Sequence, residues 1–309
     1  MAMYNLKNGR IEVVKETAFK LEADIQSLVE TNLSDMLGLD FVKSQFTVSG
    51  SVQPLRIDTL AFDPKIKAFV IIEYKQGRSF SVVDQGYAYL AVMLNNKADF
   101  ILEYNDRGKT ILKRNQVDWS QSRVIFISQS FTSYQKEAIN LKDLPIALWE
   151  IKRYGNGAIH FEEIRKLSAT ESIKTISKAN SAVGVVNKEV VVYSEQDHFE
   201  GIPPSFIELY EELKEKVLEL GEVEIKVNKH YISFTSKGSN FVDVQLLNRE
   251  GVRIVLNLAK GKLNDPYKLT RDLSGVGHLG NGDYACSFKT SEKLDYIVTL
   301  VKQAYLAKA

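Results

Sequence analysis

Cysteine is nearly absent from this sequence, which has 309 residues and one thiol, Cys286. One cysteine cannot form an internal disulfide, so a disulfide-stabilised secreted fold is excluded. The residues around it, Asp-Tyr-Ala-Cys-Ser-Phe, are typical of a strand. We therefore expect Cys286 to be a buried structural thiol and not a nucleophile.

Long apolar runs are also absent. No stretch reaches the ~18 consecutive apolar residues of a membrane span. The opening residues, MAMYNLKNGRIEVVKE, contain no apolar core of a signal peptide. These absences favour a cytoplasmic protein that has no membrane partner.

The sequence has almost no excess charge. Lysine and arginine number 40 against 39 aspartates and glutamates, which gives a net charge of +1. This balance excludes a uniformly basic nucleic-acid-binding protein, although a local basic groove can lie on a neutral protein. The four histidines are scattered without the spacing of a zinc site. They are His160, His198, His230 and His278.

What is present is the composition of an ordinary globular protein, with 44% hydrophobic and 26% charged residues. The length suits about two domains. Residues 166–202 are rich in serine, threonine, lysine and small side chains, and we predict that they form a linker. The linker would join a domain at 1–165 to a second domain at 203–309.

Hydrophobic periodicity predicts an α/β unit in residues 1–165. Apolar residues at helical spacing over 17–37, ended by Gly38, predict an amphipathic helix. The apolar run at 69–72 predicts a central strand that is covered on both faces. The other expected elements are strands at 41–49, 55–62, 67–75, 98–104, 123–128, 146–153 and 158–163, and helices at 81–94 and 132–140.

The hydrophobic pattern of residues 203–309 predicts a smaller α+β domain. Helices are expected at 205–220 and 291–306, and strands at 222–227, 230–235, 240–247, 251–258 and 284–289. No carboxylate cluster, nucleophile or metal-binding set stands out in this sequence. Its basic residues form either a face for nucleic acid or a solvated sheet face; they are Lys226, Lys229, Lys237, Arg249, Arg253, Lys260 and Lys262.

The chemistry is concentrated in two strands of the first domain. Asp58 lies in one strand, and fourteen residues separate it from Glu73 in the next. A hairpin between the two strands would bring Asp58 beside Glu73. Because strand side chains alternate, Glu73 and Lys75 point to the same face. Two carboxylates and an ammonium group are thus expected at the end of a very apolar strand, where isolated charges are costly.

This set of groups suits a divalent cation. Mg²⁺ prefers oxygen ligands and is often held by one or two carboxylates with waters and substrate phosphate. Asp58 and Glu73 can supply the carboxylates, and the main-chain carbonyl of Tyr74 can supply a third oxygen. Lys75 can orient or deprotonate a water and offset charge that develops on a phosphate. The sequence therefore predicts a metal-dependent hydrolytic site.

Two residues of the following helix extend the pattern. Gln85 and Tyr89 are four apart and share one helical face. Over residues 15–165, Asp-x14-Glu-x-Lys followed by Gln-x3-Tyr resembles the RecB-like branch of the PD-(D/E)XK nucleases. The resemblance implies a restriction-endonuclease-like mixed sheet flanked by helices. It also implies that Gln85 and Tyr89 contact the active site or the DNA.

The resemblance assigns a further carboxylate. Glu22 looks like the family's helical glutamate, which contributes to the metal site, and Glu16 and Glu30 are alternatives on or near the same predicted helix. Ile57 stands where the family motif has proline, a substitution that is common in the family. Three basic residues near the site either contact phosphate or are solvated surface charges; they are Lys43, Arg56 and Arg78.

The resulting hypothesis is a deoxyribonuclease that depends on Mg²⁺ or Mn²⁺ and acts in defence or repair. DNA is the expected partner, and a homodimer is left open. The alternative is a nuclease-fold subunit that binds nucleic acid or protein without cleaving. Residues 203–309 resemble an uncharacterised domain that recurs behind nuclease-like domains, which implies an architecture and no activity. We expect this domain to engage the substrate.

Overall fold

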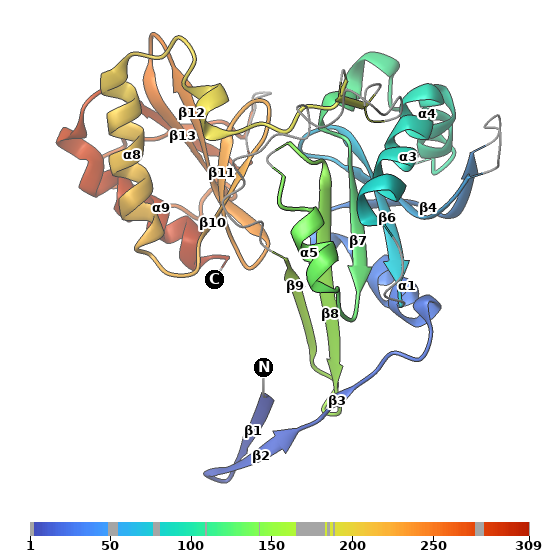
Figure 1. Cartoon of the computed structure of the whole chain (residues 1–309). Coiled ribbons are helices and arrows are strands. Elements are labelled where there is room, and N and C mark those ends of the chain that lie inside the picture. The colour runs from blue at the N-terminus through green and yellow to red at the C-terminus, as the bar shows by residue number, and fades with distance from the viewer. Residues whose placement is uncertain are drawn as a thin grey trace. The chain divides into compact units, whose positions relative to one another are not determined.

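The computed structural model describes residues 3–48, 55–76, 81–108, 110–141, 143–164, 183, 186–187, 189–275 and 281–308. The chain divides into two compact units, residues 1–192 and 193–309. Figure 1 shows both units. Among the described residues, no helix has both the length and the apolar character needed to cross a membrane.

The first unit is built on a seven-stranded mixed sheet in the order β3–β8–β7–β6–β5–β4, with β9 beside β8. Its strands are β3 (Glu16–Thr17), β4 (Asp40–Val48), β5 (Leu55–Asp63), β6 (Ala68–Lys75), β7 (Arg123–Ser128), β8 (Ile146–Tyr154) and β9 (Ile159–Glu163). β6 pairs antiparallel with β5 and parallel with β7. This mixed sheet, flanked by helices, confirms the expected α/β class.

Helices cover both faces of this sheet (Figure 1). On one face lie α1 (Glu22–Thr31) and α2 (Leu33–Leu37); on the other lie α3 (Val82–Asn95), α4 (Lys97–Asn105) and α5 (Ser133–Ala138). Successive residues of β6 enter opposite cores, with Phe69 and Ile71 on the α3 side and Val70 and Ile72 on the α1 side. Two covered faces explain why β6 is continuously apolar.

The predicted strand at 98–104 is wrong, because this segment belongs to α4. Phe100 and Tyr104 are buried and lie four residues apart, which is a helical spacing, whereas Leu102 between them is 62% exposed. The short alternation of polar and apolar residues imitated a strand. The predicted helix at 17–37 is also too long, because it begins at Glu22 and is divided at Asn32.

A hairpin that the sequence reading missed precedes this sheet. β1 (Met3–Lys7) and β2 (Arg10–Val14) pair with each other in a two-stranded sheet. Asn8 and Gly9 form the turn and both have positive φ, 52° and 75°. An Asn-Gly pair between alternating apolar residues is the strongest short-range signal for a hairpin.

The second unit is a six-stranded antiparallel sheet in the order β10–β11–β12–β13–β15–β14, with two helices packed on it. Its elements are α8 (Pro204–Leu218), β10 (Glu224–Val227), β11 (Ile232–Ser236), β12 (Ser239–Leu247), β13 (Gly251–Leu256), β14 (Arg271–Asp272), β15 (Tyr284–Phe288) and α9 (Leu294–Leu306). Cys286 is buried in β15, which confirms the structural thiol. Burial raises the pKa of this thiol to about 12, so the reactive thiolate is disfavoured.

Short 3-10 helices complete the described chain: Arg114–Gln116, Trp119–Gln121, Glu195–His198 and Ser291–Lys293. Much of the predicted linker lies outside the described residues. Its described part packs against the two units. Val186 and Val190 are buried in the first core, and Val191 donates a backbone hydrogen bond to Ser120. Tyr210 of α8 donates to Glu195 at 2.6 Å.

The close approach of α3 to β8 depends on Gly86. A β-carbon at this position would lie 2.4 Å from Cδ1 of Ile146. We expect Gly86→Ala to lower the free energy of unfolding by about 1 kcal/mol, because overpacking costs about 1–3 kcal/mol and the better helix propensity of alanine offsets part of it. Ile146→Val removes the obstructing methyl group. Chemical denaturation should therefore show the double variant to be less destabilised than the sum of the two single changes. Strict additivity would contradict this packing.

Candidate active site

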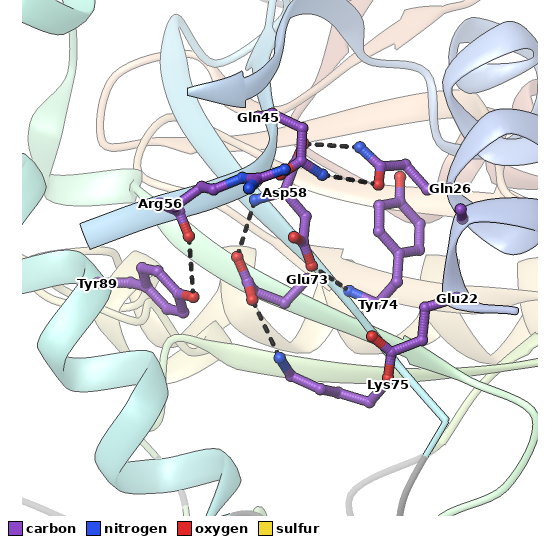
Figure 2. Close-up of a pocket in the computed structure, with 10 residues that line it drawn as sticks. Glu22, Gln26, Gln45, Arg56, Asp58, Glu73, Tyr74, Lys75 and Tyr89 are labelled. Carbon is purple, nitrogen blue, oxygen red and sulfur yellow. Dashed lines mark hydrogen bonds and ion pairs between the residues drawn. The ribbon is translucent and has the colours of Figure 1, made fainter. Parts of the chain in front are cut away.

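The centre of the site is the point where β5 and β6 part. Their regular pairing ends at Thr59 and Ile72. Beyond it, the Asp58 backbone N–H donates to Glu73 Oε1 at 3.0 Å, and the Tyr74 backbone N–H donates to Asp58 Oδ2 at 3.1 Å. In the gap between the strands, these two backbone N–H groups therefore bond to side-chain carboxylates and not to the carbonyls of a neighbouring strand (Figure 2).

Glu73 is an unusual residue to bury, because its side chain lies beside a second carboxylate. It is 1% exposed, whereas Asp58 is half-buried. Burial and then the charge of Asp58 raise the pKa of Glu73 from 4.5 to about 7. The Asp58 N–H, the charge of Lys75 and the Tyr89 hydroxyl act in the opposite direction. An additional cation at this position would stabilise both carboxylates.

Lys75 lies on the same side of β6 as Glu73, as predicted. Its Nζ is 3.2 Å from Glu73 Oε2, and Figure 2 shows the two side chains pointing toward each other. The structure therefore brings together the three residues on which the sequence hypothesis depends. Their convergence follows from the period of two along β6 together with the hairpin between β5 and β6.

Glu22, the first residue of α1, reaches the end of β6. Its Oε1 accepts a hydrogen bond from the Gln76 backbone N–H at 2.6 Å. The side chain of Gln76 in turn donates to the carbonyls of Phe19 and Lys20, at 3.2 and 2.9 Å. Gln129, after β7, also donates to Phe19 O, at 3.2 Å. The two glutamines therefore fix the start of α1, and Glu22 with it, beside the site.

The alternatives to Glu22 do not line the pocket. Glu30 accepts a hydrogen bond from the Thr59 hydroxyl at 2.5 Å, and Glu16 lies exposed in β3.

Of the two residues predicted on α3, only one lines the pocket. Tyr89 lines the pocket and donates to the Arg56 carbonyl at 3.4 Å. Gln85 is not a lining residue and contacts Tyr89, with Nε2 3.5 Å from its hydroxyl.

Two glutamines and an arginine complete the site, and sequence reasoning missed the glutamines. Gln45 Nε2 donates to Gln26 Oε1 at 2.9 Å, Gln26 Nε2 donates to the Asp58 carbonyl at 2.9 Å, and Arg56 Nε donates to Gln45 Oε1 (Figure 2). Gln45 has a φ of 52°, which is rare for a residue with a side chain, and strained backbone of this kind is common at functional sites. Gln26 lies four residues after Glu22, and this spacing was the signal that could have identified it.

The side chains line an open pocket of about 440 Å³. Its lining residues are Glu22, Ala23, Gln26, Gln45, Arg56, Asp58, Glu73, Tyr74, Lys75 and Tyr89. Of the three basic candidates for phosphate contact, Arg56 lines the pocket, Lys43 pairs with Glu103 at 2.9 Å, and Arg78 lies outside the described residues.

The described residues contain no group of three or more His, Cys, Asp or Glu side chains that could enclose a metal ion. A Mg²⁺ site does not require such a group, because this ion retains several waters and commonly uses one or two carboxylates. The donor set of Asp58 and Glu73, two oxygen ligands in a polar pocket, fits Mg²⁺ or Mn²⁺. The raised pKa of Glu73, which is buried beside the half-buried Asp58, gives the same indication, because a bound cation would favour both ionised carboxylates.

The fold and this pocket define a mixed α/β protein with a carboxylate–lysine site, joined to a second α+β unit. An uncharacterized protein of Haemophilus influenzae is 45% identical over 305 residues, which cover 98% of this chain and 99% of that protein. The chain belongs to the same family as this relative. Residues 195–308 match the family described as Domain of unknown function (DUF5655).

Two solved structures are also similar to parts of the chain. EndoMS in apo form is 14% identical with a TM-score of 0.25, and the match covers 45% of this chain and 59% of that one. Pyrococcus furiosus SfsA in complex with Ca²⁺ is 14% identical with a TM-score of 0.22, covering 50% and 76%. At these identities and TM-scores, neither structure bears on the function of this chain.

Proposed function

We propose that this protein is a metal-dependent nuclease of the PD-(D/E)XK type that hydrolyses phosphodiester bonds in DNA. The observation that carries the proposal is the convergence of Asp58, Glu73 and Lys75 in one pocket, at the point where β5 and β6 part. Their chemistry suits phosphodiester hydrolysis, which needs a held cation, an oriented water and a positive charge beside the phosphate.

In this proposal Asp58 and Glu73 hold Mg²⁺ or Mn²⁺, with the Tyr74 carbonyl as a third ligand and Glu22 at the edge of the site. When bound, the ion supplies Lewis-acid polarisation of the scissile phosphate. Both carboxylates are fixed before any ion binds, because each accepts a hydrogen bond from the backbone of the other strand. A site ordered in this way loses little side-chain entropy on binding.

Lys75 has two roles in the proposal. Its ammonium group, 3.2 Å from Glu73, orients the attacking water through its own hydrogen bonds. It also offsets the negative charge that develops on the phosphate. Tyr89 closes the opposite side of the pocket and is held there by Gln85 and by the Arg56 carbonyl. Tyr89 positions the substrate, Gln85 acts through Tyr89, and neither residue holds the ion.

The experiment is cleavage of supercoiled, linear duplex and single-stranded DNA by the full chain with Mg²⁺, Mn²⁺ or EDTA. We expect at least one substrate to be cut with either metal and none to be cut in EDTA. A protein that binds DNA and leaves all three forms intact with both metals would be a non-cleaving module, and the enzyme proposal would be rejected.

Arg56 is expected to bind a phosphate of the substrate. Its Nε is engaged by Gln45, which orients the planar guanidinium at the pocket, and this group suits bidentate phosphate contacts. Arg56→Ala should raise the KM for DNA about tenfold, equivalent to about 1.4 kcal/mol, and change kcat much less. The matched control is Lys43→Ala, a basic residue of β4 that pairs with Glu103 outside the pocket. Equal effects of the two changes on KM would refute this role.

A further inference from the structure

The N-terminal hairpin of β1 and β2 has one apolar face. Tyr4 is opposite Val13, and Leu6 is opposite Ile11, so the four side chains share one side of the two-stranded sheet. They are strongly exposed, by 55%, 68%, 76% and 69% respectively. Exposed apolar residues that are scattered need no explanation, but a contiguous apolar patch of a few hundred Å² on one face is often functional.

The opposite face of the hairpin lies toward the rest of the unit and is polar except at its open end, where Met3 is opposite the buried Val14. Asn5 is opposite Glu12, and Lys7 is opposite Arg10. Asn5 Oδ1 accepts a hydrogen bond from Asn156 Nδ2 at 3.1 Å, in the turn between β8 and β9. The hairpin is therefore attached to its own chain through the polar face, which leaves the apolar face directed away from that turn.

The hairpin is separate from the main sheet. Within the described residues it forms a sheet of only two strands, joined to the main sheet through the short β3 (Figure 1). A two-stranded hairpin is marginally stable in water unless an apolar face packs against another surface. Four apolar residues lie on one exposed face, and the other face is polar beyond Met3 and Val14. This alternation is the pattern of a half-buried strand pair.

We propose that this apolar face binds the same face of a second copy of the chain, so that the hairpin is a dimerisation arm. A two-fold interface of this kind is self-complementary, because each copy supplies the same four side chains. Their exposed surface amounts to roughly 400–500 Å² per hairpin. Two copies would remove roughly 800–1,000 Å² from water, close to the lower limit of about 1,000 Å² for a specific interface. The area suits a reversible dimer.

The test is sedimentation equilibrium of the full chain over concentrations from about 1 to 500 µM, since an interface at this lower limit gives a weak, concentration-dependent dimer. We expect the dimer to be lost in Leu6→Thr/Ile11→Thr, which keeps the strand propensity and removes the apolar face. The matched control is Lys7→Thr/Glu12→Thr on the polar face, which should still dimerise. A chain that stays monomeric at every concentration, or a dimer unchanged by the first double variant, would overturn the proposal.

A second measurement identifies the contact directly. Because the chain has one cysteine, which is buried, a cysteine introduced in the hairpin is the accessible thiol. Leu6→Cys should give a covalent dimer with a short bismaleimide, and Asn5→Cys on the polar face should give little. Equal cross-linking at the two positions would contradict packing through the apolar face. Binding of a monomeric chain to phospholipid vesicles, lost in Leu6→Thr/Ile11→Thr, would replace the dimer with a lipid surface.

Discussion

Lys75→Ala is expected to cut DNA about a thousandfold more slowly than the unchanged protein. Removing one group that stabilises developing charge costs about 10²–10³ in rate, and Lys75 is proposed to orient the water as well. Metal binding should persist, because the two carboxylates do not depend on Lys75 for their backbone hydrogen bonds. The measurement is single-turnover cleavage with saturating Mn²⁺, together with a metal titration.

The control for this change is Lys65→Ala. Lys65 is an exposed lysine at the turn between β5 and β6, at the other end of the same hairpin from the site. It should leave the cleavage rate unchanged within about twofold, as expected of a solvated surface charge. Wild-type activity in Lys75→Ala would refute the role assigned to the lysine, and comparable losses in both variants would point to a general effect on folding.

Glu73→Gln is expected to make the metal-free protein more stable at alkaline pH, by up to about 3 kcal/mol. The folded protein raises the pKa of Glu73 from 4.5 to about 7, so its ionised form is disfavoured relative to the unfolded chain. Below about pH 4.5 the glutamate is protonated in both states and contributes nothing. As pH rises from about 4.5 toward about 7, Glu73 ionises first in the unfolded chain, which stabilises the unfolded state. Above about pH 7 Glu73 is ionised in both states, and the loss of folding stability has reached its full value.

Thermal and urea unfolding in EDTA at pH 5 and pH 8.5 measures this effect. Glu73→Gln should gain stability over the unchanged protein at pH 8.5 and show a much smaller gain at pH 5. Glu137→Gln, an exposed glutamate of α5, is the control and should show no such pH dependence. A destabilised Glu73→Gln at pH 8.5 would mean that the carboxylate is not under electrostatic strain. Stability gained at the expense of activity is common at sites of this kind.

The core of the site could be predicted because it depends on local periodicity. Alternation along a strand places Glu73 and Lys75 on one side, and a hairpin of fixed length brings Asp58 to the same end. The structure confirms both relations. Spacing on a helix likewise predicts that Gln85 and Tyr89 are neighbours, and they are in contact. It does not predict that only Tyr89 lines the pocket, because that depends on how α3 is rotated against the sheet.

Of the two glutamines that were missed, Gln26 lies on the regular helix α1, whereas Gln45 depends on irregular backbone. Gln45 reaches the pocket from a position of β4 with positive φ, between the paired residues Ser44 and Phe46, which keep the same register with β5. No periodic pattern reveals a single residue with positive φ in advance. The error at α4 has another cause: Phe100 and Tyr104 are buried by the tertiary fold at helical spacing, and this overrides a short alternating pattern. The role of the second unit in substrate engagement stays a prediction.

The central claim is that Asp58 and Glu73 hold a divalent cation, and calorimetric titration with Mn²⁺ tests it most directly. The full chain should bind about one Mn²⁺ in the pocket, and Asp58→Asn, which removes one of two ligand carboxylates, should weaken this binding about a hundredfold or more. Glu137→Gln is the control, because Glu137 is an exposed carboxylate of α5 that does not line the pocket, and this variant should bind Mn²⁺ as the unchanged protein does. Absence of binding to the unchanged protein, or identical binding by Asp58→Asn, would contradict the account.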